Sequence, residues 1–345
     1  MTEKSKKNPI CVGAGLIALD VVMNGNPKVS LKVFAGGSCG NVITILSYLN
    51  WVTFPVARLK KNKAAKELLS DLRSWNVKTT MITRTEDGST PIIIHRITKD
   101  KNDNSIHRFE FKNPDNGRWL PTYKPVLLKD VEELTKKCEV PDVFYFDRQT
   151  PSSIKLAQYY KSKGSLIFFE PSNIVDKNTF QKCLMLADII KFSSEQIKEY
   201  SIMYKKQQVQ LEIETLGTNG LRYRFSHNLT CRKWTQIPSF KIGFVVDAAG
   251  AGDWCAAGII SQIGDKGKAG FDRINLKVLR NALIYGQALG ALNCFFDGAR
   301  GSMYNLNKKK LTNFTKVIQS NKTASIIKTA PIIFKKKKID INKLY

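Results

Sequence analysis

The feature that most constrains the fold of this 345-residue chain is a run of small residues, D-A-A-G-A-G-D, at positions 247–253. Apolar residues occupy positions 244–246 before the run, and an apolar pattern with helical spacing continues after it to Ile263. This order predicts the end of a buried strand, a tight turn and the start of a helix. The free amides and the dipole of a helix N-terminus attract anions, and glycine lets a ligand approach the backbone. The run therefore predicts an α/β fold with an anion-binding turn.

A single carboxylate, Asp253, stands at the start of the predicted helix. Next to a bound phosphate a carboxylate is repelled, unless the two share a task such as activating a hydroxyl that attacks the phosphate. The alternative is an N-cap aspartate after a Gly-rich turn, which is common. From spacing alone the two interpretations are equally good.

Residues 247–253 resemble the D-T-x-G-A-G-D signature of the PfkB/ribokinase-type carbohydrate kinases, with Ala248 where Thr is usual. The resemblance implies that Asp253 is the catalytic base. It also implies that the anion hole for the transferred phosphoryl group is formed by the amides of Gly250, Ala251 and Gly252. Trp254 is bulkier than the residue expected directly after the base, and its effect on the surroundings of the phosphates is left open.

A second signature of the same family, G-G-x-x-x-N, is matched by Gly36, Gly37 and Asn41. Two glycines let a substrate lie against the backbone, and an Asn amide both donates and accepts hydrogen bonds. Alone, the segment would indicate only a Gly-rich turn before a helix, but its order ahead of residues 247–253 favours the family interpretation. The resemblance further implies that Asp20, after the first strand, binds sugar hydroxyls.

The segment G-A-G-L-I-A at positions 13–18 superficially fits the dinucleotide-binding pattern G-x-G-x-x-G/A. That pattern needs a helix after the first glycine and an acidic residue about twenty positions later. Asp20, Gly25 and Pro27 interrupt any helix, and positions 33–40 contain no acidic residue. The dinucleotide interpretation is therefore weak.

Three sequence features relate to binding of the phosphoryl donor, which is ATP in this family. Thr215, Gly217 and Gly220 resemble the T-x-G-x-x-G segment that lies beside the ATP phosphates in the family, and Asp247 is assigned to the same site. Glu195 stands near the place of the glutamate in an N-x-x-E motif that helps to organise Mg²⁺, with a serine in place of the asparagine. The resemblance therefore implies ATP and Mg²⁺ as cofactors and leaves a monovalent-cation requirement open.

Continuous apolar strands alternate with amphipathic helices in the middle of the chain. Strands are predicted at 143–146 and 165–169, and helices at 130–137 and 152–163. Such alternation indicates a parallel sheet that is covered on both faces. We therefore expect an α/β, ribokinase-like fold with a central, mostly parallel sheet and helices on both faces.

The outer boundaries of this domain are also predicted. Two strand-like segments within residues 89–112, together with residues 21–35, are expected to form a small β-sheet lid over the sugar site. The kinase domain is expected to span residues 1–304. Residues 305–345 are expected to be a basic C-terminal extension that frays.

The net charge of +26, from 55 Lys and Arg against 29 Asp and Glu, raises nucleic acid or an acidic membrane surface as a partner. The lysines are spread along the chain, however, and aromatic residues do not alternate with them as in a stacking platform. We favour a lysine-rich surface that also attracts phosphorylated small molecules.

Seven scattered cysteines without a C-x-x-C pair indicate a reducing compartment rather than a disulfide framework. The three histidines do not combine with them at zinc-ligand spacing, and no apolar run approaches the ~20 residues of a membrane helix. The chain is expected to be soluble and cytoplasmic.

The sequence thus predicts an ATP-dependent kinase that phosphorylates a hydroxyl of a sugar or sugar-like small molecule. One alternative is a nucleoside kinase, which an aromatic pocket built from Phe109, Phe111, Trp119 and Tyr123 would favour. Another is a non-catalytic, basic nucleic-acid-binding protein on the same scaffold. The phosphoryl acceptor and the oligomeric state, including a homodimer, are left open.

Overall fold

The computed structural model describes residues 7–23, 32–99, 105–227, 233–321 and 341–345. The larger of its two sheets has nine strands in the order β13 (Thr235–Ile237), β12 (Leu221–Phe225), β11 (Leu211–Thr215), β10 (Ile189–Ser193), β9 (Leu166–Phe169), β8 (Val143–Phe146), β1 (Ile10–Ala14), β4 (Val52–Lys60) and β5 (Ile82–Thr85). The strands from β11 to β5 are parallel, whereas β12 and β13 are antiparallel at one edge. The mostly parallel central sheet predicted from the sequence is confirmed.

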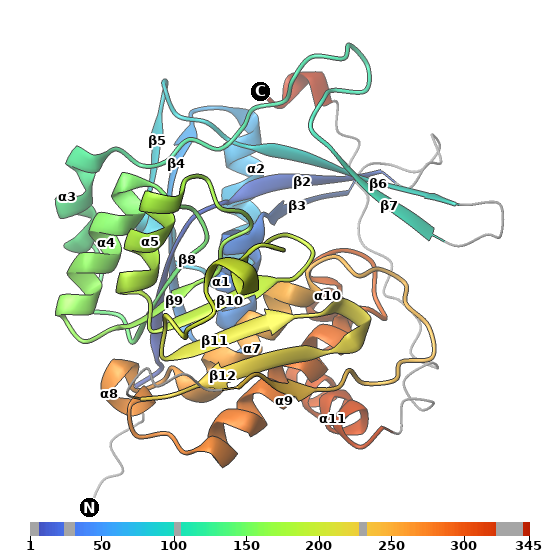
Figure 1. Cartoon of the computed structure of the whole chain (residues 1–345). Coiled ribbons are helices and arrows are strands. Elements are labelled where there is room, and N and C mark those ends of the chain that lie inside the picture. Colours follow the sequence, from blue (N-terminus) through green and yellow to red (C-terminus); the bar gives the residue numbers. More distant parts are fainter. Residues whose placement is uncertain (1–6, 24–31, 100–104, 228–232, 322–340) are drawn as a thin grey trace, which may run out of the picture.

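The second sheet has the order β3 (Lys32–Gly36), β2 (Ala18–Met23), β6 (Ile92–Lys99) and β7 (Ser105–Glu110). In Figure 1 it projects from the body of the molecule beyond the ends of the central strands. The expected lid segments therefore do form a small separate sheet, although residues 24–31 and 100–104 lie outside the described part of the chain.

Helices cover both faces of the central sheet (Figure 1). One face carries α3 (Val131–Thr135), α4 (Pro151–Ser162), α5 (Lys177–Leu186) and the short α6 (Tyr200–Met203). The other carries α1 (Ser38–Tyr48), α2 (Lys63–Ser74), α7 (Ala251–Ile263), α8 (Gly267–Phe271), α9 (Leu276–Asn293), α10 (Gly301–Asn305) and α11 (Lys308–Gln319). The predicted arrangement of helices on both faces is confirmed.

Strand β8 shows why two apolar layers form. Its side chains alternate between the faces of the sheet, so Val143 and Tyr145 pack in the layer of α1, α2, α7 and α9, whereas Phe144 and Phe146 pack in the layer of α3–α5. All four residues are fully buried, as expected for a strand in a doubly covered parallel sheet. The continuous apolar run in the sequence is explained by this burial.

Local signals determine where several helices begin. The side chain of Thr150 accepts a hydrogen bond from the Ser153 N–H, and Pro151 occupies the first helical position of α4. Both are favourable at a helix N-terminus, because the first amides lack helical partners and proline lacks an N–H. Asn275 caps α9 in the same way through the Val278 N–H. The helix predicted at 152–163 is thus confirmed with a shift of one residue.

Residues 244–246, predicted to end a buried strand, are irregular instead, and Phe244 and Val245 are 42% and 54% exposed. The backbone of this segment pairs with the end of a helix, since the Val246 N–H donates to the Cys294 carbonyl at 2.8 Å. The apolar run therefore misled the strand prediction. Val245 lines the cavity, and Phe244 packs edge-on against Phe295 with ring centroids 5.2 Å apart.

The C-terminal segment is packed where it is described, so the prediction of fraying was wrong for this part. Leu311 and Ile318 of α11 are buried on α9, and Asn307 caps the helix. Leu344 is fully buried, and its carbonyl accepts from the Ala64 N–H at 2.9 Å. The lysines at 308–310 are the exposed first turn of an amphipathic helix. The domain boundary at residue 304 stays a prediction.

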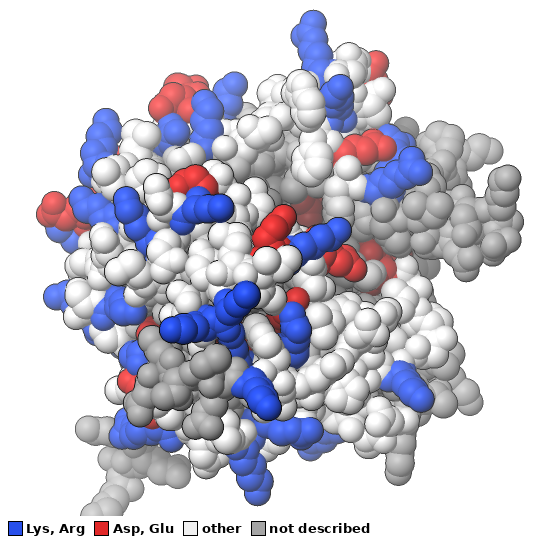
Figure 2. Space-filling view, viewed as in Figure 1, with Lys and Arg blue, Asp and Glu red and all other residues white. Residues whose placement is uncertain are grey.

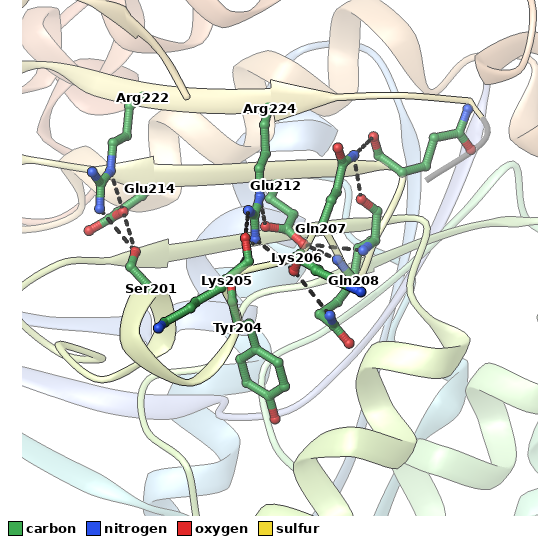
Figure 3. Close-up of polar contacts among 12 residues, drawn as sticks. Ser201, Tyr204, Lys205, Lys206, Gln207, Gln208, Glu212, Glu214, Arg222 and Arg224 are labelled. Carbon is green, nitrogen blue, oxygen red and sulfur yellow. Dashed lines mark hydrogen bonds and ion pairs between the residues drawn. The ribbon is translucent and has the colours of Figure 1, made fainter. Parts of the chain in front are cut away.

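A closed polar network holds the edge of the central sheet (Figure 3). The fully buried Glu212 of β11 accepts from Arg224 Nε of β12 at 2.6 Å and from the Gln208 N–H at 2.6 Å. The remaining Arg224 nitrogens donate to the backbone carbonyls of Tyr204, Lys205 and Lys206. The network ties the loop after α6 to the β11–β12 pair.

Among the described residues, none of the helices combines the length and apolar character needed to cross a bilayer.

Candidate active site

A cavity of about 1420 Å³ lies where the central parallel strands end, between them and the small sheet. Carboxyl ends of parallel strands meet at one edge, which is the usual place for ligands in open α/β sheets. Pockets for a single small molecule typically measure ~300–1000 Å³, so this cavity has room for two ligands. Figure 2 shows acidic side chains gathered at the centre of this face and basic side chains spread around them.

The predicted anion-binding turn forms one wall, and Gly250, Ala251 and Gly252 all line the cavity. Gly250 caps α7 with a φ of 74°, and a Cβ at this position would lie 2.1 Å from the Ala299 carbonyl oxygen, so glycine is required. The Ala251 N–H donates to the Ala248 carbonyl at 3.2 Å. The Ala251 amide is therefore used within the turn, whereas the exposed Gly252 lies at the helix N-terminus, where amides have no helical partner.

Asp253 is in the first turn of α7, and its half-buried side chain lines the cavity. The Nδ2 of Asn41 from α1 donates to its Oδ2 at 2.8 Å. Desolvation and the nearby Glu170 carboxylate raise the pKa of Asp253 well above its usual range, although the Asn41 hydrogen bond and Lys191 act in the opposite direction. A carboxylate with a raised pKa is a better proton acceptor than an ordinary aspartate. Asn41 and Asp253 were predicted separately, and the structure brings them into contact.

A buried ion pair that the sequence analysis did not predict lies beside this turn. Lys191 of β10 is 2% exposed, and its Nζ donates to the carboxylate of Glu170, which follows β9. Burial opposes the charge, but Glu170, Cys255 and Asp253 together outweigh burial and raise the pKa of Lys191. A Cβ built on Gly252 would lie 3.7 Å from Nζ. A fixed positive charge therefore stands next to the anion-binding turn.

On the wall formed by the small sheet, Asp20 of β2 lies opposite Phe34 of β3, and both line the cavity. Burial raises the pKa of Asp20 to about 7, an effect that Arg300 opposes and Asp71 reinforces. Asp20 and Asn41, both predicted acceptor ligands, are therefore parts of one cavity together with Asp253.

The two glycines of the second signature have different roles. Gly37 lines the cavity with a φ of 79°. Gly36 is outside the lining, and a Cβ on it would lie 1.9 Å from Asp20 Oδ2. The absence of a Cβ at Gly36 makes room for the Asp20 carboxylate, and its contact with a substrate stays a prediction.

Two buried aspartates next to the cavity act as braces. Asp247, assigned to the nucleotide from the resemblance, is outside the lining, and its carboxylate accepts from the N–H groups of Ala249 and Gly298, each at 2.8 Å. Asp147 accepts from the N–H groups of Leu16 and Cys39, each at 3.0 Å. Asp247 therefore holds the anion-binding turn against the loop after α9, and its assignment to the nucleotide stays a prediction.

Trp254, the bulky residue after Asp253, is not part of the cavity lining. Its side chain is fully buried and packs edge-on against Tyr48, with ring centroids 6.3 Å apart. Residues one position apart on a helix point about 100° away from each other, so Asp253 faces the cavity while Trp254 faces the core.

The predicted nucleotide segment lies at the same cavity, since Thr215, Gly217 and Gly220 all line it. Glu195 is exposed and lines the cavity beside this segment, with its Oε1 3.7 Å from a Cβ built on Gly217. An apolar part of the lining is contributed by Phe240, Ile242, Val245 and Ala291. The walls thus combine Gly-rich backbone with an apolar surface, as a nucleotide requires.

The carboxylates at the cavity bear on the predicted magnesium. Mg²⁺ in proteins is commonly held by one or two carboxylates together with water and substrate phosphates. Glu195 and Glu170 supply such oxygens, and within the described ranges no group of three or more His, Cys, Asp or Glu could hold a metal. This donor set fits an ion that is held mainly by a nucleotide.

The four aromatic residues proposed for a nucleoside pocket divide into two pairs. Phe109 and Phe111 of the lid region line the cavity and are 56% and 49% exposed. Trp119 and Tyr123 are outside its lining, and Trp119 packs under the Lys112 ammonium at 4.9 Å. Only the first pair can contact an acceptor in this cavity.

The family comparison agrees with this geometry. A model of the pfkB carbohydrate kinase family matches residues 10–305, which is most of the chain. The chain belongs to the pfkB family of carbohydrate kinases. None of the curated protein sequences matches it. Membership of this family and the arrangement of the cavity support each other, because the three signatures found in the sequence meet at one site.

Solved structures of other kinases share the fold of this pfkB family member. The fructokinase of Xylella fastidiosa with bound ATP has 18% identity and a TM-score of 0.70, covering 92% of this chain and 99% of its own. The nucleoside kinase of Methanocaldococcus jannaschii has 18% identity and a TM-score of 0.63, covering 90% and 99%. A fructokinase double mutant of Vibrio cholerae O395, bound to fructose, ADP and potassium, has 17% identity and a TM-score of 0.68, covering 89% and 99%. The predicted ribokinase-like fold is confirmed.

Two polar residues of the cavity were missed as site residues by sequence reasoning. Lys191 lies within an apolar strand, and a charged residue in such a run was a usable signal, because a buried lysine needs a partner. Arg300 follows α9 in the segment G-A-R-G and carries no local signal. Its partners come from distant parts of the chain, which only the fold brings together.

Proposed function

We propose that this protein transfers the γ-phosphoryl group of ATP to a hydroxyl of a sugar or sugar-like small molecule, with Asp253 as the base. The proposal depends most on the position of Asp253 in the first turn of α7. Its carboxylate accepts a hydrogen bond from Asn41, and both side chains line the same cavity. An acceptor hydroxyl bound near Asn41 would thus lie next to a proton acceptor and an anion-binding turn.

The residues of this chain divide the chemistry between them. Asp253 takes the proton of the attacking hydroxyl, and its raised pKa favours that transfer. The Gly252 amide at the helix N-terminus and the Lys191 ammonium stabilise negative charge on the transferring group. Phosphoryl transfer has a largely loose transition state, so positioning and charge stabilisation contribute more than base strength.

Thr215, Gly217 and Gly220 are proposed to lie beside the nucleotide phosphates, and the apolar wall at Phe240 and Ile242 beside the base. Glu195 and Glu170 would hold Mg²⁺, which when bound neutralises charge on the phosphates. Of the two fructokinases with this fold, one is described with bound ATP and the other with ADP and a potassium ion. A potassium requirement of this chain and its cytoplasmic location stay predictions.

A nucleoside is the second candidate acceptor, favoured by one observation. Phe109 and Phe111 present exposed aromatic surface to the cavity from the lid, where a nucleobase could stack. Nucleoside kinases are among the structures that share the fold. The sugar remains the first candidate because family membership is with carbohydrate kinases.

The decisive experiment measures ADP release with Mg-ATP across D-fructose, D-ribose, D-gluconate, fructose 6-phosphate and inosine. Turnover with any one of them supports a small-molecule kinase and identifies the acceptor class. The absence of turnover with every acceptor, combined with tight and strongly salt-dependent binding of DNA or RNA, would instead support the nucleic-acid-binding alternative.

A further inference from the structure

Arg300 is a buried arginine of the cavity wall whose hydrogen bonding is incomplete. It is 3% exposed and lines the cavity. Its Nη2 donates to the Ala35 carbonyl and to Asp71 Oδ2, both at 2.5 Å. Its Nη1 is buried and has no partner within the described part of the chain. A buried donor without a partner costs about 1–3 kcal/mol, so it marks a place where a ligand is expected to complete the bonding.

The cavity wall near Arg300 also contains a buried acceptor oxygen without a hydrogen-bond partner among the described residues. Asp20 Oδ1 is buried and lacks a partner among the described residues, as does Asn41 Oδ1. Asp20 and Ala35 are adjacent, since Asp20 pairs with Phe34 across β2 and β3 and its carboxylate fills the space over Gly36. The Arg300 guanidinium is thus held next to Asp20 through the Ala35 carbonyl. Among the described residues, the wall thus presents an unpaired donor on Arg300 and an unpaired acceptor on Asp20, and the two side chains interact electrostatically.

The charge of this cluster selects against acidic ligands. Arg300 contributes one positive charge, whereas Asp20 and Asp71 contribute two negative charges when ionised. Asp71 is committed to the scaffold, because it also accepts from the Ala35 N–H at 2.9 Å and from Tyr304 Oη at 3.3 Å. The guanidinium is already neutralised by Asp71, and above about pH 7 a carboxylate or phosphate on the ligand would meet the ionised Asp20 carboxylate.

We propose that Arg300 is a specificity-determining residue that donates through Nη1 to an acceptor hydroxyl adjacent to the hydroxyl bound by Asp20, and that the acceptor is a neutral polyol in this region. The inference rests on the proposed kinase function and deepens it. Two neighbouring hydroxyls match one free donor and one free acceptor, because a hydroxyl can both donate and accept.

Kinetics with analogues of the acceptor test the pairing. With the neutral acceptor that gives the highest turnover, Arg300→Met is expected to raise the acceptor KM about 10- to 100-fold, as for a lost hydrogen bond to a charged group, with the KM for ATP unchanged. With a series of monodeoxy analogues, the ratio of mutant to wild-type KM should fall to about one for a single analogue, the one that lacks the partner hydroxyl of Arg300. An equal ratio for all analogues would overturn the pairing.

Two further variants separate hydroxyl binding from packing. Arg300→Lys keeps the positive charge but replaces the planar set of guanidinium N–H donors with a single ammonium group. It serves as the test variant if Arg300→Met does not fold. Asp71→Asn perturbs the scaffold while leaving Nη1 in place, so it should not reproduce the analogue-specific pattern. If Asp71→Asn and Arg300→Lys showed the same loss for every analogue, Arg300 would be a packing residue and the proposal would be wrong.

The acceptor panel tests the charge argument separately from the function. D-Fructose or D-ribose should be used at least about tenfold better than D-gluconate or fructose 6-phosphate, because like charges disfavour the acidic ligands. A preference for an acidic acceptor would overturn the neutral class while leaving the kinase function intact. Absence of turnover with the whole panel would instead count against the proposed function itself.

Discussion

Arg224 and Arg300 are both 3% exposed and both pair with a carboxylate, yet they differ in how completely they are bonded. Arg224 lies in the closed network of Figure 3, where all three of its nitrogens donate to Glu212 or to backbone carbonyls. The buried Nη1 of Arg300 has no partner in the described residues, and the Arg300 side chain lines the cavity.

Burial and charge by themselves therefore do not distinguish a structural arginine from a ligand-binding one. A fully bonded buried arginine has no hydrogen bond left to give, so its contribution is to hold the loop after α6 against β11 and β12. An incompletely bonded one at a cavity retains a donor for a ligand. Polar groups of the cavity and of the closed network should therefore respond differently to substitution.

The largest expected effect belongs to Asp253 in the cavity. Asp253→Asn removes the proton acceptor, and turnover should fall about 10²–10⁴-fold. The free energy of unfolding should change by less than ~1 kcal/mol, since Asn keeps the size and can still cap the helix. ATP affinity should hold or rise, because a negative charge near the phosphates is removed. Turnover, calorimetric ATP binding and thermal melting on one preparation measure all three, and unchanged turnover in the folded variant would refute the catalytic role.

The closed network should show the opposite pattern. Arg224→Met leaves the fully buried Glu212 without its charge partner, which typically costs about 3–5 kcal/mol in the free energy of unfolding. Turnover per folded molecule should stay at the wild-type value. Arg222→Met is the matched control: its side chain is 33% exposed, its pair with Glu214 is more open to water, and its loss should be about 1 kcal/mol or less. Urea unfolding measures both, and equal losses would contradict the comparison.

Substitution of Asp20 should weaken binding of the phosphoryl acceptor and leave the affinity for ATP unchanged. Asp20→Ala removes the acceptor oxygen of the cavity wall, and binding of the sugar should weaken by about 1–3 kcal/mol. ATP binding should be nearly unchanged, because Asp20 belongs to the small sheet. Calorimetric titration with each ligand tests this, and wild-type affinity for the sugar would show that the acceptor lies elsewhere.

The smallest effect is a pH dependence of the ligand-free protein. The pKa of Asp20 is raised to about 7, so between its ordinary value and pH 7 the folded state holds a proton that the unfolded state has lost. The stability associated with this proton is complete below about pH 4 and is lost as pH rises to about 7. Asp20→Asn lacks the titration, so its Tm relative to the wild type should increase across this window. A difference in Tm that is constant with pH would contradict the raised pKa.

Part of this protein could be predicted from its sequence. The strand at 143–146, the lid strands and the helices on both faces followed from local patterns, because burial on two faces requires continuous apolar runs. The three signatures indicated the family, and their ligand residues Asp20, Asn41 and Asp253 do meet in one cavity. A local motif can determine a helix N-terminus and the residue on it, since both depend on neighbours in the chain.

What the tertiary structure decided is which polar groups remain available. Asp247 is the first residue of the 247–253 signature, but its carboxylate already accepts hydrogen bonds from the Ala249 and Gly298 amides. The absence of a side chain at Gly36 leaves room for the Asp20 carboxylate. Arg300 has no local signal, and its bond to the Ala35 carbonyl spans 265 positions. Whether a side chain can bind a ligand depends on hydrogen bonds that distant segments have already taken, and only the folded chain sets that balance.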